Sequence, residues 1–299
     1  MVTATEVFRS LQRADCVERA FVLYAVGIDS EAGLDGLFHL LRVESADAER
    51  ALEQLAQYEI ERRPAPPAPP LPPHRHAWIG CALYAAVLIV IALVVANGLW
   101  GPDAFAAGEL DAGRVQAGQW WRAWTALTLH LNGTHLTANL VGGIWFGYVA
   151  SRQLGAGHAW LLAVTGAACA NLLEAFIGPA SHRAVGASTA VFAALGVLSA
   201  YAWRLRVRSA QHWRERWALQ WAPLIGGIVL LSWTGSGGGS DGHPVDVVAH
   251  VLGFAAGAVL GALAAQQRIQ RLLLRVPQWV SGLAALAQII VAWGLALAR

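Results

Sequence analysis

The sequence is poor in charge for its length. Only 13% of its 299 residues are Asp, Glu, Lys or Arg, whereas a soluble globular domain usually has about 25%. Lysine is absent, so all 21 basic residues are arginines, and the formal net charge is +2. This balance excludes a protein that binds nucleic acid through basic charge, and the 56% of hydrophobic residues excludes a disordered chain.

Motifs of cysteine chemistry and of secretion are missing as well. The three cysteines, Cys16, Cys81 and Cys169, have no metal or redox spacing. Cys81 and Cys169 lie in apolar runs, where a free cysteine behaves as a small hydrophobe, so we expect no disulfide. No ligand spacing in the sequence suggests a metal or an organic cofactor. No cleavable signal peptide is expected either, because the first 60 residues are too polar and the first long apolar run starts near residue 77.

The charge that is present is concentrated at the N-terminal end. Residues 1–75 hold 20 of the 40 charged side chains, and the remaining 224 residues share the other 20. We predict a small soluble α+β domain over residues 1–63, followed by a Pro-rich linker over 64–76 that is extended and stiff. A docking ligand for a partner is the alternative interpretation of the Pro-rich stretch. The elements expected in the domain are strands at 18–28 and 37–43, a helix at 45–62 and a short helix near 7–14.

Seven charge-free windows follow the linker. Each is long enough for a transmembrane helix, which needs about 20 apolar residues to cross the hydrocarbon core. The windows cover residues 76–102, 123–151, 153–173, 184–203, 217–240, 247–267 and 276–298. The predicted fold class is therefore an all-α polytopic membrane protein.

The arginines predict the orientation of these helices. If the N-terminus is cytoplasmic, the inner loops contain nine arginines and the outer loops three, and Arg299 lies outside. Positively charged residues favour the cytoplasmic side. We therefore expect a multi-pass protein of a bacterial inner membrane, with a cytoplasmic N-terminus and an external C-terminus.

Polar residues inside the predicted spans are candidate functional residues, because they are costly there. The second window carries His130, His135 and Asn139, and the last two share one helix face. Ser188 lies where the fourth helix is expected to begin, and free backbone N–H groups at such an end can hold a developing negative charge. His250, near the start of the sixth window, is a candidate base for activating Ser188.

Ser188 and His250 are predicted to lie at similar depth, because the fourth and sixth spans run in the same direction. Within about 60° of His250 around its helix, three positions are glycine. They are Gly253, Gly257 and Gly261. Such a stripe lets two membrane helices touch. Each feature alone has a plainer interpretation, as a hydrogen bond to the helix backbone, a contact between helices or simple packing.

Together these motifs resemble the rhomboid intramembrane serine proteases over residues 77–265. The residues that carry the resemblance are Trp121, Arg122, His130, His135, Asn139, Gly186, Ala187, Ser188, Ala249, His250, Gly253 and Gly257. The resemblance implies a six-helix core over 77–267 whose site opens to the outer face. Residues 268–299 would then add a cytoplasmic loop and a seventh helix, which we interpret as packing or partner contact.

The resemblance also implies the roles of individual residues. Ser188 would be the nucleophile and His250 the general base. His135, Asn139 and the Ser188 backbone N–H would form the oxyanion hole, supported by Gly186. Trp121, Arg122, Gly253 and Gly257 would be structural, and His130 would help to order the first outer loop. Substrates would be transmembrane proteins cleaved near helix-breaking sites with small residues, and no cofactor would be needed.

Four further residues near the proposed site are interpreted from the chemistry. A serine–histidine dyad lacks the orienting acid of a triad, and Phe192, one turn after Ser188, is predicted to stack on His250. Asp246 is interpreted as structural rather than as a triad acid, and Glu174 as interfacial. Thr189 stands where the family often has glycine, and its branched side chain would narrow the access of substrate.

Three functions remain as alternatives. The first is an active protease, and the second is an inactive protein on the same fold that binds transmembrane clients. The third is a proton-coupled transporter using the histidines, which should show an internal repeat or broken helices; neither is seen. The glycine-rich residues 235–242 are interpreted as a movable cap or as a plain loop, Trp100 and Trp121 as part of an interface belt, and the oligomeric state is left open.

Overall fold

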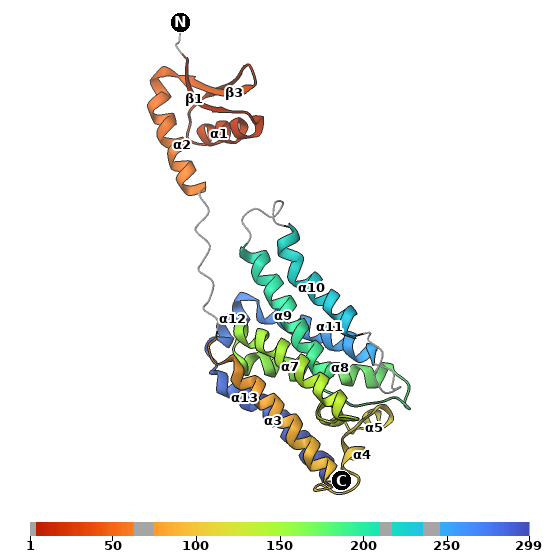
Figure 1. Ribbon diagram of the computed structural model, residues 1–299. Coiled ribbons are helices and arrows are strands. Elements are labelled where there is room, and N and C mark those ends of the chain that lie inside the picture. The colour runs from red at the N-terminus through yellow and green to blue at the C-terminus, as the bar shows by residue number, and fades with distance from the viewer. Residues whose placement is uncertain (1–3, 63–73, 210–216, 236–245, 299) are drawn as a thin grey trace. The chain divides into compact units, whose positions relative to one another are not determined.

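The computed structural model describes residues 4–62, 74–209, 217–235 and 246–298. The chain divides into two compact units, Met1–Pro69 and Pro70–Arg299 (Figure 1). Most of the predicted linker, 64–76, and nearly all of the predicted cap, 235–242, lie outside the described residues.

The first unit packs two helices with a three-stranded antiparallel sheet. The strands are β1 (Ala4–Ser10), β2 (Ser30–Asp35) and β3 (Phe38–Glu44), in the order β1-β3-β2, and the helices are α1 (Arg13–Ala25) and α2 (Ala48–Arg62). A 3-10 turn, Ser45–Asp47, leads into α2. The core of the first unit contains Leu23, Ile28, Leu41, Val43 and Ala51, which come from α1, the sheet region and α2.

Two of the four elements predicted in this unit are confirmed. The strand at 37–43 corresponds to β3, and the helix at 45–62 corresponds to the turn and α2. The strand predicted at 18–28 is wrong, because most of that segment is α1, whose buried residues Cys16, Arg19 and Leu23 follow helical spacing. The helix predicted near 7–14 is also wrong over most of its length, because β1 pairs with β3 there.

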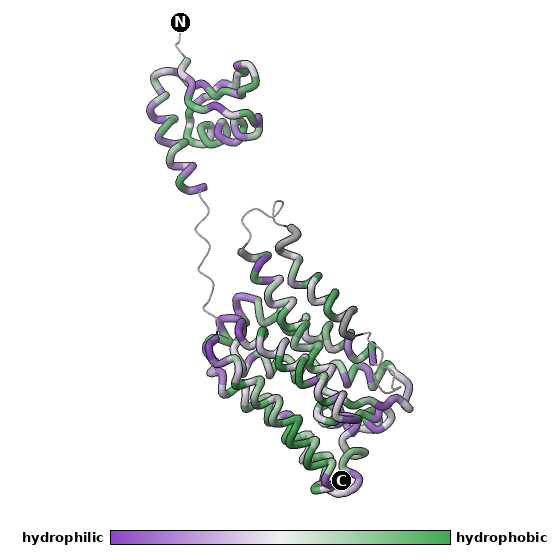
Figure 2. Tube along the Cα trace, viewed as in Figure 1, coloured by the Kyte–Doolittle hydropathy of each residue, from purple (hydrophilic) through white to green (hydrophobic). Residues whose placement is uncertain are grey.

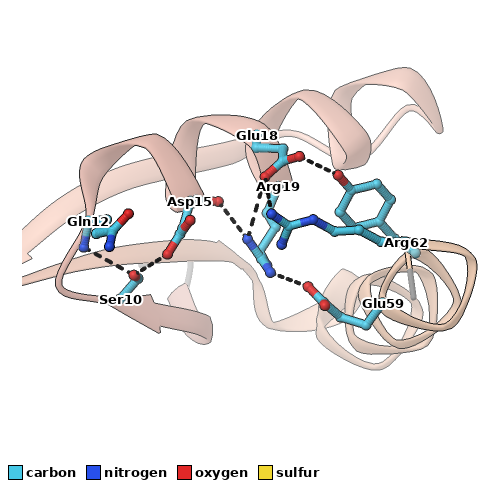
Figure 3. Close-up of polar contacts among 8 residues, drawn as sticks. Ser10, Gln12, Asp15, Glu18, Arg19, Glu59 and Arg62 are labelled. Atoms are coloured by element: carbon cyan, nitrogen blue, oxygen red, sulfur yellow. Dashed lines mark hydrogen bonds and ion pairs between the residues drawn. The ribbon is translucent and has the colours of Figure 1, made fainter. Parts of the chain in front are cut away.

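Polar contacts join the two helices of this unit (Figure 3). Arg19, buried on α1, donates to the Asp15 carbonyl oxygen at 3.1 Å and pairs with Glu59 of α2. The Tyr58 hydroxyl donates to Glu18 at 2.6 Å, and this bond raises the pKa of Tyr58. The apolar core and these contacts together hold α1 against α2.

Long helices dominate the second unit. In its described part they are α3 (Ala77–Ala96), α7 (Gly133–Leu154), α8 (Ala156–Ile177), α9 (Ser188–Ser209), α10 (Trp217–Gly235), α11 (Val247–Ala264) and α13 (Gln278–Leu297). Each falls mainly within one of the seven predicted windows. Among the described residues, five of these helices, α3, α8, α9, α11 and α13, are long and apolar enough to cross a membrane, and in Figure 2 the trace of α3 has the hydrophobic colour along most of its length. The protein is therefore an integral membrane protein.

The second window, 123–151, was predicted to form one continuous span, and the structure differs from this prediction. The helix begins only at Gly133, where the Asn132 side chain caps it by accepting the His135 N–H at 2.8 Å. The residues before it form α6 (Arg122–Thr125), a 3-10 turn over Ala126–Thr128 and an extended segment. His130 therefore lies in a loop, because the absence of charge does not by itself make a helix.

Short elements fill the segment between α3 and α6. They are α4 (Ala104–Gly108), β4 (Leu110–Asp111) and α5 (Ala112–Gln116), and β4 pairs with β5 (Arg183–Ala184). Arg122 is buried and donates to the carbonyl oxygens of Ala106 and Glu109 at 2.9 and 2.8 Å. Its guanidinium therefore holds this segment against α6 through the backbone.

The C-terminal helix α13 packs against α8 and against the segment around α6, and the short helix α12 (Gln267–Leu273) precedes it. Trp293 Nε1 donates to Thr128 Oγ1 at 3.0 Å, and Ser281 Oγ lies 2.8 Å from His158 Nδ1. Trp121 belongs to the same apolar cluster as Trp293 and is only 4% exposed. Its predicted place in an interface belt is therefore wrong, because the ring is enclosed by protein.

Candidate active site

The contact between α9 and α11 sets the geometry of the candidate site, and among the described helices it is the most extensive one. A side chain at any of three glycines of α11 would overlap a carbonyl oxygen of α9. The pairs are Gly253 with Thr189, Gly257 with Ala193, and Gly261 with Val197. Both sets advance four residues at a time in the same chain direction, so the helices run parallel with their backbones in contact.

This register brings the start of α9 level with the start of α11. His250 lies one turn before Gly253, and Ser188 is the neighbour of Thr189, which faces that glycine. The rings of Phe192 and His250 are 4.4 Å apart between centroids, at an interplanar angle of 39°. Both side chains are buried. The two rings are therefore in contact as predicted, but they are tilted rather than stacked.

Ser188 is the first residue of α9, and the turn before it depends on Gly186. Gly186 has φ +138, which side chains rarely adopt, and a Cβ there would lie 2.8 Å from His135 Nε2 and 3.6 Å from Ser188 Oγ. The backbone of Gly186 is anchored by its N–H, which donates to the Ala126 carbonyl oxygen at 2.9 Å. The His135 ring therefore approaches Ser188 across a glycine.

Two histidines lie on this side of the site. The rings of His130 and His135 are 5.2 Å apart between centroids in an edge-to-face arrangement. The Ala187 N–H points to His130 Nε2 at 3.5 Å, a long contact. His130 thus reaches from its loop toward the turn that precedes Ser188.

Asn139 is buried on α7, one turn after His135. Its side-chain Nδ2 donates to the His135 carbonyl oxygen at 3.1 Å, and its backbone carbonyl oxygen accepts the hydroxyl of Tyr84 on α3 at 2.8 Å. The amide has a second N–H that this contact does not use. Tyr84 was missed in the sequence, although a phenol in an apolar span has to find an acceptor.

Asp246 and Thr189 lie near His250 and Ser188 in the chain, and both take part in structural contacts. Asp246 caps α11, with Oδ1 accepting the Ala249 N–H at 3.0 Å. Thr189 is buried with its methyl group toward Gly253.

The arrangement therefore combines a serine at a helix N-terminus, a buried histidine held by an aromatic ring, and a second histidine beside the serine. Comparison with known proteins agrees with this chemistry. The Rhomboid domain model matches residues 117–267, and the chain belongs to the rhomboid family, whose members are generally serine proteases that act on transmembrane substrates within the membrane. A protein of Bacillus subtilis (strain 168) named "Putative rhomboid protease YdcA" is 27% identical over 157 residues, 52% of this chain and 73% of that protein.

Proposed function

We propose that this protein is an intramembrane serine endopeptidase that cleaves transmembrane-anchored substrates with Ser188 and His250. The observation that carries the proposal is the contact between the rings of Phe192 and His250, one helical turn from Ser188, where the backbones of α9 and α11 approach closely. A single serine or a single histidine in a membrane helix would not support this function. The position of both residues at the same level of two helices in contact does support it.

The reaction would follow acyl-transfer chemistry. Ser188 Oγ attacks the scissile carbonyl carbon as His250 accepts its proton, and the resulting oxyanion is stabilised by the Ser188 N–H and by the side chains of His135 and Asn139. His250 then gives the proton to the leaving amine. A water molecule, deprotonated by His250, then attacks the acyl carbon, and His250 returns the proton to Ser188 Oγ as the acyl–oxygen bond breaks and the carboxylic acid product leaves. No step in this sequence needs a metal or an organic cofactor.

The proposed dyad needs a replacement for the orienting acid of a triad. Asp246 does not supply it in this arrangement, since its Oδ1 is used as the helix cap. Phe192 limits the tilt of the His250 ring by contact with its face. The proposed role of Phe192 is therefore to position the base.

The proposal includes a topology. A core of six membrane helices over 77–267 would be followed by α13 as the seventh, so α7 and α10 would also cross the bilayer. The arginine distribution supports a cytoplasmic N-terminal domain, 1–63, and a site that opens to the outer face of a bacterial inner membrane. Accessibility labelling of single cysteines placed at Asn97 and at Gln266 would test this orientation, with labelling from outside expected only at Asn97.

The experiment that tests the function is a cleavage assay on the full chain. Purified wild type in detergent or vesicles should cleave a model transmembrane substrate and react with a fluorophosphonate probe. Ser188→Ala and His250→Ala should abolish cleavage while leaving the thermal unfolding temperature within a few degrees. Equal cleavage by wild type and Ser188→Ala would disprove the proposed nucleophile.

An inactive protein that binds transmembrane clients is the competing function. Its support in the sequence was Thr189, where the family often has glycine. The Thr189 methyl group packs toward Gly253 in the helix contact, which weakens that support. Binding of the substrate by wild type, without cleavage or labelling by the probe, would favour this second function.

A further inference from the structure

Three ionisable side chains that the proposed reaction does not use meet beside the active site. Glu174 lies near the end of α8, His182 immediately before β5, and Asp246 at the start of α11. His182 Nε2 is 3.6 Å from Glu174 Oε1 and 3.3 Å from Asp246 Oδ2. One nitrogen and two carboxylate oxygens from these residues all lie within 4.8 Å of one another. We name this set the carboxylate–histidine cluster.

The cluster is poorly satisfied by the described part of the protein. The Glu174 side chain is only 4% exposed, so its interpretation as interfacial is wrong. Its Oε2 is buried with no hydrogen-bond partner among the described atoms. His182 Nε2 is also buried, and although Asp246 Oδ2 is 3.3 Å away, this contact does not have the geometry of a hydrogen bond. Buried polar groups without partners are uncommon in native proteins and call for a ligand or water.

The charge of the cluster is also uncompensated by arginine. Arg183 follows His182 in the chain, but its guanidinium pairs with Glu109 and Asp111. Among the described residues no arginine forms an ion pair with Glu174 or Asp246. Two carboxylates around one imidazole would gain from a dication, because a buried charge is tolerated when it is paired or coordinates a metal.

We propose that the carboxylate–histidine cluster binds a divalent transition-metal ion, with Zn²⁺ as the best-suited ion. With metal–ligand bonds of about 2.0–2.1 Å, the ligand atoms of a tetrahedral zinc site lie about 3.3 Å apart. The two distances from His182 Nε2, 3.6 and 3.3 Å, are close to that value. An imidazole favours zinc over magnesium or calcium, and a water molecule would complete the fourth position.

Two of the three ligands, His182 and Asp246, are held in place by contacts that do not involve the ion. The His182 N–H donates to the Pro179 carbonyl oxygen at 2.9 Å, and its carbonyl accepts the Ala112 N–H at 3.0 Å. Asp246 uses Oδ1 for its helix cap, which leaves Oδ2 directed at His182. A site of this kind needs little rearrangement to bind an ion. No spacing pattern along the chain indicates this site, because its ligands are separated by 8 and 64 positions.

The position of the cluster couples it to the proposed reaction. His182 lies six residues before Ser188, and Asp246 lies four residues before His250. A bound ion would join α8 to the segments that lead into both residues. We infer that it stabilises the protein and fixes the relative positions of the dyad. The effect of the ion on the dyad rests on the proposed function, whereas binding of the ion does not.

The test uses the full chain in detergent, stripped of metal with a chelator and then titrated with Zn²⁺ or Co²⁺. Wild type should bind one Zn²⁺ per chain after desalting, and Co²⁺ should give the visible absorption of a four-coordinate ion. Glu174→Gln, His182→Gln and Asp246→Asn should each weaken binding by at least about tenfold. Asn retains the oxygen that caps α11, so Asp246→Asn should remain folded.

Exposed Asp103 and His76 supply matched control variants, because neither side chain caps its helix. Asp103→Asn and His76→Gln should bind Zn²⁺ as wild type does, and Zn²⁺ should raise the unfolding temperature of wild type and controls only. Absence of stoichiometric Zn²⁺ binding, or binding that all three cluster variants retain, would overturn the proposal. These measurements do not depend on cleavage. A protein that binds Zn²⁺ but cleaves no substrate would therefore refute the proposed protease activity and leave the proposed zinc site standing.

Discussion

The ring of Phe192 contacts the ring of His250 at 4.4 Å between centroids, and both side chains are buried. The two residues come from different helices, so this contact relates the orientation of the proposed base to the helix that begins with Ser188. An aromatic ring here supplies what a carboxylate supplies in a triad, namely a restricted set of imidazole orientations. It supplies no charge.

Replacing Phe192 should therefore change turnover more than substrate binding. Phe192→Leu should lower kcat by about tenfold or more with a smaller change in KM. The substitution removes the constraint on the orientation of the base, whereas the substrate keeps its contacts. Phe192→Tyr should retain most of the activity, since it keeps the ring. Michaelis–Menten analysis with a fluorescent transmembrane substrate gives both parameters. A kcat for Phe192→Leu equal to that of Phe192→Tyr would contradict a positioning role.

The helix contact leads to a second prediction, at Gly257. A side chain there would overlap the Ala193 carbonyl oxygen, so Gly257→Val should push α11 from α9. The expected loss of stability is about 1–3 kcal/mol, the usual range for overpacking, together with loss of cleavage. The free energy of unfolding, measured by denaturation in mixed micelles, checks the first effect.

Gly294 provides the matched control for this substitution. It is also a helical glycine, on α13, but a side chain there would meet no heavy atom within 4 Å. Gly294→Val should therefore leave both stability and cleavage close to wild type. Equal losses in the two variants would show that valine harms these helices for a reason other than the contact between α9 and α11.

Substitution of Thr189 can separate two effects of its side chain. One is the effect on the access of substrate, and the other is the effect on the packing of α9 against α11. The Thr189 methyl group lies 3.1 Å from the position that a Cβ on Gly253 would take. We expect Thr189→Ala to lower stability by about 1 kcal/mol through the lost contact and to change kcat/KM by less than about threefold. Thermal unfolding and cleavage assays measure the two effects. A large gain in kcat/KM would mean instead that the methyl group obstructs the substrate.

The sequence predicted the long helices of the second unit well because each one depends on local composition. A run of about 20 apolar residues leaves the backbone few alternatives in lipid, and all seven windows contain a long helix in the described residues. The window at 123–151 was predicted less well, since its first ten residues form short turns that a count of charges does not detect. In the N-terminal unit, residues 18–28 are rich in apolar and branched residues, and only their pairing partners decide between strand and helix.

The candidate site could be predicted where spacing along one helix carried the information. Gly253 and Gly257 mark the face of α11 that carries His250, and that face does pack on α9. Contacts between distant segments could not be predicted in this way. The meeting of Glu174, His182 and Asp246 depends on how α8 and α11 are placed by the whole bundle, and no pattern along the chain encodes it.

Gly186 offers the sharpest test of the oxyanion side of the site, because two of its properties can be separated. Its φ is +138, and a Cβ would lie 2.8 Å from His135 Nε2. Gly118 also has a positive φ, +98, but a Cβ there would meet no heavy atom within 4 Å. Gly118→Ala therefore introduces backbone strain alone, whereas Gly186→Ala adds a clash with His135.

Both alanine variants should lose about 1–2 kcal/mol of stability from the unfavourable backbone conformation. Only Gly186→Ala should also lose cleavage, by about a hundredfold or more, because removal of one oxyanion donor typically has an effect of that size and the added methyl group displaces the His135 ring. Unfolding and single-turnover cleavage measured on the same preparations separate these effects. If Gly186→Ala cleaves as fast as Gly118→Ala, the His135 ring does not act on the oxyanion from the position it occupies beside Ser188.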